Sequence, residues 1–544
     1  MLNRTATRTR VAAAMLAGAL LVTGCANSGD DKDDNNSGSN GNNSGEMSKE
    51  DIYVQGIVGD TSDAGEPKDG GTLEVVEYAE ARSLDPTKTI PNGAVGGNAL
   101  AAIYDTLLRY DTTEDTFIPQ LAESLESDDD VTWTLKLREG VKFTDGTPLN
   151  AAAVLGSIGY FMENKGFNVL ALATNIKDMK PVDDLTVEFT LNKPWATFPM
   201  MLTSGAGMIL APAAIKGGPD KFKPIGAGPF KFESYSPAEE LVLARNDDYF
   251  GEKAHLDKIR FTWIQADQAK YDAFKNGNAD VISVRAPAVL EEARRDGWSG
   301  IMNPVGSGAT ITINNREGRP GHSLKVRQAI NAAIDPELYL ERSQDGAGLP
   351  TRNLYSKAYP YYTDVETADY DPELAKKLVA EAKAEGADTT LSYIGQSDPV
   401  SQSAAVTIKA MLEEAGFTVE LDLLRDVAEQ TARIYGSRDF DLAVGGLSMA
   451  EDPYTSLASN VYSTSPSSGN GYVNKEMDKL IDELQSKRPV EAIDTLKAIN
   501  ELWQETIPTV ILSEGGFFSP WQDNVHGIIP TSQNIMLYGG AWKS

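Results

Sequence analysis

Cysteine and histidine are almost absent from this chain: among 544 residues there is one cysteine and there are three histidines. A single thiol excludes a disulfide within the chain. The histidines His255, His322 and His526 lie far apart, and none belongs to an HExxH or HxH spacing that would hold a metal. The sequence therefore offers no metal site, and we expect neither a metal nor another cofactor.

Catalytic motifs are missing as well. The sequence has no P-loop and no G-x-S-x-G elbow, because GWSGI at 297–301 lacks the closing glycine. Acidic residues are abundant, so composition alone leaves room for a carboxylate pair that hydrolyses glycosides, although no spacing singles one out. These observations favour a protein that is not an enzyme, and an exported hydrolase stays open as an alternative.

Basic residues are also scarce relative to acidic ones. Lysine and arginine number 49 against 79 aspartates and glutamates, which gives a formal net charge of −30. This excess argues against binding to nucleic acid and against direct adsorption to anionic lipid. No run of 18 apolar residues occurs after residue 22, so no later segment is expected to cross a membrane. The length predicts two or three lobes, since it exceeds what one core usually organises.

The start of the chain has a characteristic order. Residues 1–10 carry three arginines and no acid, residues 11–22 are apolar, and Val22-Thr23-Gly24-Cys25 follows. The apolar run is too short to span the roughly 30 Å of a bilayer's hydrocarbon. This order resembles a bacterial lipoprotein signal, which implies cleavage before Cys25, a lipid on its sulfur and an extracytoplasmic location. An ordinary secretory signal with a chance cysteine is the alternative.

Residues 26–69 are rich in asparagine, glycine, serine and aspartate. Such a composition buries too little apolar surface to offset the entropy of ordering, which predicts a disordered polar tether. Beyond it, apolar periodicity predicts a strand-rich first half and an α/β second half. The expected elements include strands within 72–80 and 185–194, two strands in 131–143 around a turn at Glu139-Gly140, a strand pair from VLARNDDYF and KIRFTWI, helices over 149–163, 324–334 and 372–386, and a parallel βαβ unit over 390–424.

Four stretches stand out by their order and spacing. They are GGTLEVVEYAEARSLDP (70–86), WTLKLREGVKFTDGTPLNAAAV (133–154), PIGAGPFKF with LVLARNDDYFG (224–251), and VRQAINAAIDPE (326–337). Together they resemble the extracytoplasmic solute-binding proteins of ABC importers, family 5, the peptide- and nickel-binding type. Most of these residues have a structural interpretation: Gly226 and Gly228, for example, are expected to let the backbone turn tightly before Pro229.

The resemblance implies an α/β fold of the two-lobe periplasmic-binding-protein type (type II, cluster C). Residues 1–25 would be the signal, 26–69 the tether, 89–189 an extra subdomain of lobe 1, and 306–511 lobe 2. Lobe 1 would comprise residues 70–88, 190–305 and 512–544. The implied partners are a small solute held between closing lobes and the permease and ATPase subunits of an importer. We expect a monomer that touches the membrane through its lipid alone and binds no nucleic acid.

The resemblance also implies a site for the ligand. Peptide-binding members place an aspartate against the ammonium group of the peptide, in a segment that ends in Asp-Pro. Asp452-Pro453 matches that Asp-Pro here, but an ungapped alignment puts Met449 at the ammonium-binding acid, and a short gap would offer Glu451 instead. A short peptide is the favoured solute, and a sugar, organic acid, opine or metal chelate is the alternative. A cell-envelope sensor with the same fold is a further alternative.

Other candidate ligand contacts follow from position only, and each is equally compatible with an ordinary surface or packing role. They follow the first strand, a Pro199 turn, a second-lobe strand or the Asp-Pro pair. These candidates are Tyr78, Glu80, Arg82, Ser204, Gly205, Tyr393, Gln396 and Tyr454.

Overall fold

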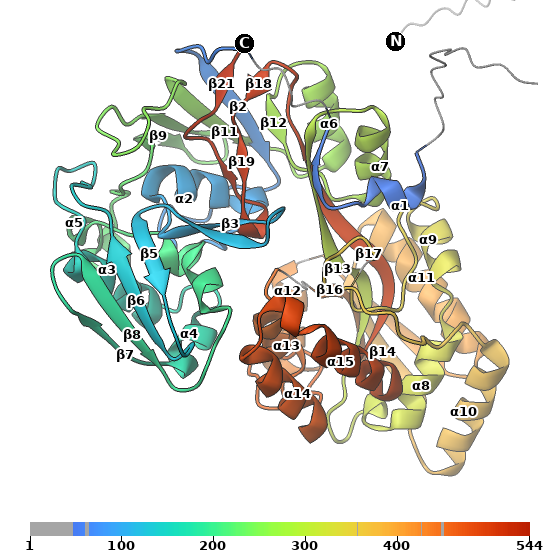
Figure 1. Cartoon of the computed structure of the whole chain (residues 1–544). Coiled ribbons are helices and arrows are strands. Elements are labelled where there is room, and N and C mark those ends of the chain that lie inside the picture. The colour runs from blue at the N-terminus through green and yellow to red at the C-terminus, as the bar shows by residue number, and fades with distance from the viewer. Residues whose placement is uncertain (1–46, 60–64, 356, 426, 448–450) are drawn as a thin grey trace, which may run out of the picture. The chain divides into compact units, whose positions relative to one another are not determined.

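The computed structural model describes residues 47–59, 65–355, 357–425, 427–447 and 451–544. The predicted signal 1–25 with Cys25 lies outside these residues, as do the tether up to residue 46 and Met449. Three sheets of four or more strands organise the described part of the chain (Figure 1). No helix in the described ranges has both the length and the apolar character that crossing a membrane requires.

The first sheet has five strands in the spatial order β12-β2-β11-β10-β9. β2 lies between two parallel neighbours, whereas β11, β10 and β9 follow one another in antiparallel order, which confirms the predicted strand pair. Leu73 and Val75 of β2 share one apolar core with the buried helix α2. The bounds are β2 (Thr72–Glu77), β9 (Phe230–Ser236), β10 (Glu240–Arg245), β11 (Lys258–Trp263), β12 (Val281–Ile282) and α2 (Gly97–Tyr104).

The second sheet has four antiparallel strands in the order β5-β6-β8-β7 and packs against α3. The second strand predicted after Glu139-Gly140 is absent from the described structure. Val141 and Phe143 are buried there in an irregular segment whose isolated bridge joins Lys142 to Pro148. The alternating apolar residues of this segment thus reflect burial of the side chains and not the pairing of a strand. The bounds are β5 (Ala122–Glu126), β6 (Thr132–Leu137), β7 (Ile176–Pro181), β8 (Thr186–Leu191), α3 (Ala151–Glu163) and α4 (Val169–Asn175).

The third sheet has the order β1-β13-β16-β14-β15, with β17 also paired to β13. The predicted βαβ unit is confirmed: β14 and β15 are parallel, α11 connects them, and Asp398 caps the first turn of that helix. The predicted helices α8 and α10 form as well, and Gly386 follows α10 with a φ of +87°. The bounds are β14 (Thr390–Gln396), β15 (Thr418–Leu424), β16 (Leu442–Leu447), α8 (Leu324–Ala333), α10 (Pro372–Ala384) and α11 (Pro399–Glu414).

Two long strands connect these parts. β13 (Gly300–Ile313) and β17 (Thr509–Pro520) pair with each other along most of their length. At one end Met302 and Phe518 pack with residues of the first sheet, while Ile311 lies in the core of the third sheet. We call the part built on the first two sheets the first lobe and the part built on the third sheet the second lobe. The paired strands run through both.

The segment 47–59 corrects the predicted extent of the tether. These residues form α1 (Lys49–Ile52) and β1 (Gly56–Val58), and β1 adds to the edge of β13. Ile52 and Tyr53 are fully buried, and the backbone carbonyl of Ile52 accepts a hydrogen bond from Arg294 (3.0 Å). The prediction fails here because the average composition of residues 26–69 conceals a short apolar segment near its end.

The glycines of PIGAGPF have a different role from the expected turn. Neither Gly226 nor Gly228 has a positive φ. Instead, a Cβ atom on Gly228 would lie 2.3 Å from the carbonyl oxygen of Ala102, and one on Gly226 would lie 2.2 Å from that of Ile103. The two glycines therefore allow the strand β9 to approach the C-terminal turn of α2, where Gly228 donates a backbone hydrogen bond to Ile103 (2.9 Å).

Gly228→Ala is expected to lower the free energy of unfolding by about 1–3 kcal/mol, because backbone would have to move to admit the methyl group. Gly156→Ala is the matched control: Gly156 is exposed on α3 with no atom within 4 Å of an added Cβ, and the change should raise stability by about 0.5–1 kcal/mol. Urea-induced unfolding measures both. Equal effects of the two substitutions would refute the close-approach explanation.

Candidate functional site

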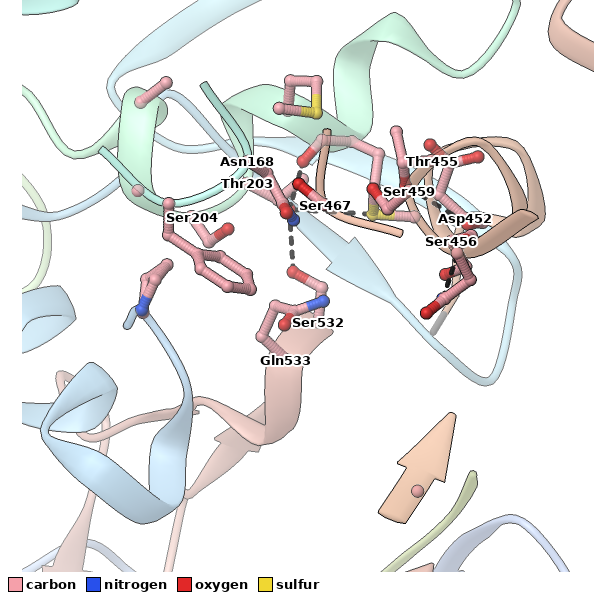
Figure 2. Close-up of a pocket in the computed structure, with 18 of the residues that line it drawn as sticks. Asn168, Thr203, Ser204, Asp452, Thr455, Ser456, Ser459, Ser467, Ser532 and Gln533 are labelled. Atoms are coloured by element: carbon pink, nitrogen blue, oxygen red, sulfur yellow. Dashed lines mark hydrogen bonds between the residues drawn. The ribbon is translucent and has the colours of Figure 1, made fainter. Parts of the chain in front are cut away.

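A cavity of about 360 Å³ is lined by segments from both lobes (Figure 2). Asp452 is the one charged side chain among its described lining residues, and most of the other polar groups are hydroxyls. The hydroxyls of Thr203 and Ser532 bond to each other across 2.7 Å. The hydroxyl-bearing residues of the wall include Thr203, Ser204, Thr455, Ser459, Ser467 and Ser532.

The carboxylate of Asp452 is held at the N-terminus of α13 (Pro453–Val461). Its Oδ1 accepts hydrogen bonds from the Thr197 hydroxyl (3.0 Å) and from the backbone N–H of Tyr454 (3.2 Å). Its Oδ2 is buried and has no hydrogen-bond partner among the described residues, since the nearby Thr455 hydroxyl donates to the carbonyl oxygen of Asp452 (3.3 Å). Only 3% of the residue is exposed. The cavity thus contains a buried acid with one unpaired oxygen.

Burial raises the pKa of Asp452 to about 6, although the nearby Thr455 hydroxyl, the hydrogen bond from Thr197 and the N–H groups at the start of α13 oppose this change. The charged form of this carboxyl is therefore costly at neutral pH when no cation accompanies it. A cation at Oδ2 would offset that cost.

The lobes contact each other beside this cavity. The indole N–H of Trp195 donates to the Thr197 hydroxyl (3.0 Å), which in turn donates to Asp452. The rings of Trp195 and Tyr454 meet edge to face at 5.6 Å, and Asn175 donates to the Tyr454 hydroxyl (3.4 Å). Residues at the end of α4 and after β8 in the first lobe thus hold the start of α13, and the acid with it, in place.

Strand β16 reaches the same cavity with one edge unpaired. On one side it pairs with β13 as far as Leu447, but on the other side β14 pairs with it only at Leu442 and Ala443. No other described strand takes up the rest of that edge. Gly446 of this edge lines the cavity. The exposed backbone groups are able to pair with an extended ligand.

A second cavity, of about 320 Å³, adjoins the first, and Gly446 and Gln533 line both. Glu451 lines the second cavity, where its carboxylate accepts hydrogen bonds from the backbone N–H (3.0 Å) and the side chain (3.3 Å) of Gln533. Burial raises the pKa of Glu451. In contrast to Asp452, this acid already has protein partners. Arg285 supplies the opposite charge in this cavity, and its guanidinium lies 4.2 Å from the ring centre of Tyr78.

Several candidates predicted from the sequence lie at these cavities. Ser204, Gly205 and Asp452 line the first, and Glu451 lines the second. Tyr454 lines an adjoining groove of about 570 Å³.

Five other candidates, Tyr78 among them, line neither of the two cavities nor the adjoining groove. Tyr393 is corrected to a packing residue: only 1% of it is exposed, because β14 lies inside the sheet and its ring belongs to the second-lobe core. Gln396 bonds to Gln430, Glu80 bonds to the β9–β10 hairpin, and Arg82 is exposed.

Sequence reasoning missed Thr197, Arg285 and Gln533. They come from three separate segments, each hundreds of positions or an entire element away from the Asp-Pro pair, and no local spacing connects them. Only the tertiary structure brings Thr197 to Asp452, and Arg285 and Gln533 to the second cavity. Among the described residues no three His, Cys, Asp or Glu side chains form a group that could hold a metal ion.

Asp452→Asn tests the electrostatic cost of this carboxylate. The amide keeps an acceptor for Thr197 and Tyr454, and asparagine caps a helix as well as aspartate does. Since the folded pKa of about 6 exceeds the ordinary 3.8, ionised wild-type protein is destabilised as the pH rises through this interval, and the cost is constant above it. In the absence of ligand the variant should be more stable by about 3 kcal/mol near neutral pH.

Urea-induced unfolding of both proteins at about pH 7.5 and at about pH 4 measures this difference. It should almost disappear at the lower pH, where the carboxyl is protonated in both the folded and the unfolded chain. A difference that stays the same at both pH values would contradict the raised pKa.

The comparisons with known proteins agree with this geometry. Residues 116–468, more than half of the chain, match the family described as bacterial extracellular solute-binding proteins, family 5 Middle. The dipeptide-binding protein of Escherichia coli strain K12 is 26% identical over 462 residues, which cover 78% of this chain and 86% of that protein.

Two solved structures extend the comparison. The PBP AgaA in complex with agropinic acid, from A. tumefacien R10, is 25% identical with a TM-score of 0.70, and the match covers 84% of this chain and 94% of that one. The Helicobacter pylori periplasmic binding protein DppA in complex with the peptide STSA is 22% identical and similar in fold, with a TM-score of 0.72 over 88% of this chain and 98% of that one.

Proposed function

The chain belongs to the bacterial extracellular solute-binding proteins of family 5, and we propose that it captures a short peptide between its two lobes and delivers it to an ABC importer. Members of this family bind a peptide or another small ligand and work with permease and ATPase subunits. The observation that carries the proposal is the carboxylate of Asp452, buried in the cavity with Oδ2 unpaired.

A free peptide supplies what this cavity lacks. Its ammonium group is a compact cation with several N–H donors, and it would pair with Oδ2 of Asp452 as the lobes exclude water. Its backbone would pair with the open edge of β16 near Gly446, as an added strand does. The hydroxyls of the wall would bond to amide groups of the peptide. One ligand would thus satisfy the acid and the strand edge together.

Delivery would depend on closure and not on a chemical step. Contacts such as Thr197–Asp452 and Trp195–Tyr454 join the lobes around the cavity. A ligand that bonds to both lobes would stabilise the closed arrangement by its differential affinity for it, and the importer would respond to that arrangement. In this proposal the protein acts as a monomer and no bond is made or broken.

Native mass spectrometry of the purified chain, followed by denaturing release, tests the class of solute. Short peptide masses are expected. A calorimetric titration of Asp452→Asn with the released peptide should show about 100-fold weaker binding, the scale for removing one member of a buried charge pair. Glu451→Gln should bind nearly as the wild type does, since Gln533 already bonds to that acid.

The converse result, a loss in Glu451→Gln with none in Asp452→Asn, would move the ammonium site to Glu451. A defined non-peptide mass would reject the peptide. An organic acid or opine is the second candidate because Met449 stands where the resemblance places the acid, and because the similar AgaA was solved with agropinic acid.

We also propose that a lipid on Cys25 anchors the protein outside the cytoplasmic membrane. The support is the order of arginines, apolar run and Val22-Thr23-Gly24-Cys25. Cys25→Ala should shift the protein from the membrane fraction to the soluble fraction, because the thiol is the only site for the diacylglycerol. Ser28→Ala, three residues on, is the matched control and should stay with the membrane. Membrane retention of the alanine variant of Cys25 would refute the anchor.

A further inference from the structure

Arg285 is fixed in position on the first-lobe wall of the second cavity. Its guanidinium stacks 4.2 Å from the ring centre of Tyr78, whose hydroxyl accepts a hydrogen bond from Gln265 (3.0 Å). Its backbone N–H and that of Ala286 both donate to Oδ2 of Asp267, at 2.8 and 2.6 Å. The loop before α7 (Pro287–Arg295) is therefore held by an acid, and the side chain by a ring.

No protein carboxylate neutralises this guanidinium. Within the described ranges, no ion pair or side-chain hydrogen bond joins it to an acid. Asp267 is engaged by the buried ammonium of Lys270 (2.8 Å), and Glu451 is engaged by Gln533. Lys270 also lies 5.6 Å from the same Tyr78 ring. Arg285 is exposed, so its donors are free to meet a ligand.

The rest of this cavity is small and of mixed character. Besides the two charged residues it presents amide side chains, glycine backbone and several apolar side chains, Phe517 among them, and Asn303 of its wall donates to Asn534 (2.8 Å). Gly446 and Gln533 also line the cavity that contains Asp452. A single ligand that passes these two residues would contact the acid of one cavity and the arginine of the other.

We propose that Arg285, stacked on Tyr78, is the subsite for a carboxylate of the ligand. The site would then select a zwitterion, with its cation at Asp452 and its anion at Arg285. A planar guanidinium is suited to this because it donates two parallel hydrogen bonds to one carboxylate. This inference rests on the proposed peptide function and specifies the end group that the peptide must carry.

The test uses two pools of the same synthetic di- and tripeptides, one with free C-terminal carboxylates and one with C-terminal amides. The purified chain is equilibrated with each pool, the bound peptides are identified by mass spectrometry, and their affinities are measured by calorimetry. Wild-type protein should bind the acids about 10- to 100-fold more tightly than the amides. If Arg285 had a purely structural role, replacing it would leave this ratio of acid to amide affinity unchanged.

Three variants test whether the side chain of Arg285 causes the preference for acids over amides. Arg285→Gln should bring the acid-to-amide ratio close to one without weakening the amides, and Arg285→Lys should restore part of it, because lysine keeps the charge but not the two-pronged geometry. Arg342→Gln is the matched control: Arg342 is an exposed arginine on α9 (Pro336–Ser343) and lines neither of the two cavities nor the adjoining groove. Thermal unfolding should be unchanged in all three.

The outcomes separate this inference from the function. Peptides that bind equally as acids and amides, or an Arg285→Gln variant that keeps the wild-type ratio, would overturn the carboxylate subsite and leave the peptide function in place. Failure of every peptide in both pools to bind would overturn both.

Discussion

The site depends on a buried carboxylate that the protein satisfies only in part. Asp452 begins α13, accepts a hydrogen bond from Thr197 of the opposite lobe and leaves Oδ2 without a partner among the described residues. Removing such a group from water costs free energy, which a cationic ligand group would return. Folding stability and ligand binding therefore make opposite demands on this one residue.

The surrounding structure brings groups from both lobes to this acid. β13 and β17 run through both lobes and carry the glycine-rich backbone that lines the second cavity. The first lobe contributes Arg285, and the second contributes Asp452 and the open edge of β16. A ligand with groups for all three would gain its full affinity only when the lobes are together. Charge placement, and not the net charge of −30, would then determine selectivity.

Local sequence patterns predicted many of the helices and strands. They failed where contacts with distant segments determine whether a residue is ordered or belongs to the site. The βαβ unit around α11 and the β10–β11 pair follow from apolar period and turn residues, which act within a few positions. The ordered segment 47–59 was missed because it gains its burial from β13 and Arg294, far along the chain. The candidate site divides in the same way: Asp452 was visible beside Pro453, whereas the stacking of Arg285 on Tyr78 joins residues separated by several elements.

The most direct test of the central claim is an electron-density map of the protein with the ligand that it retains through purification. The account predicts a cationic nitrogen of that ligand about 3 Å from Oδ2 of Asp452, in the cavity between the lobes. A ligand that places a neutral or apolar group there, or that leaves Oδ2 to water alone, would contradict it.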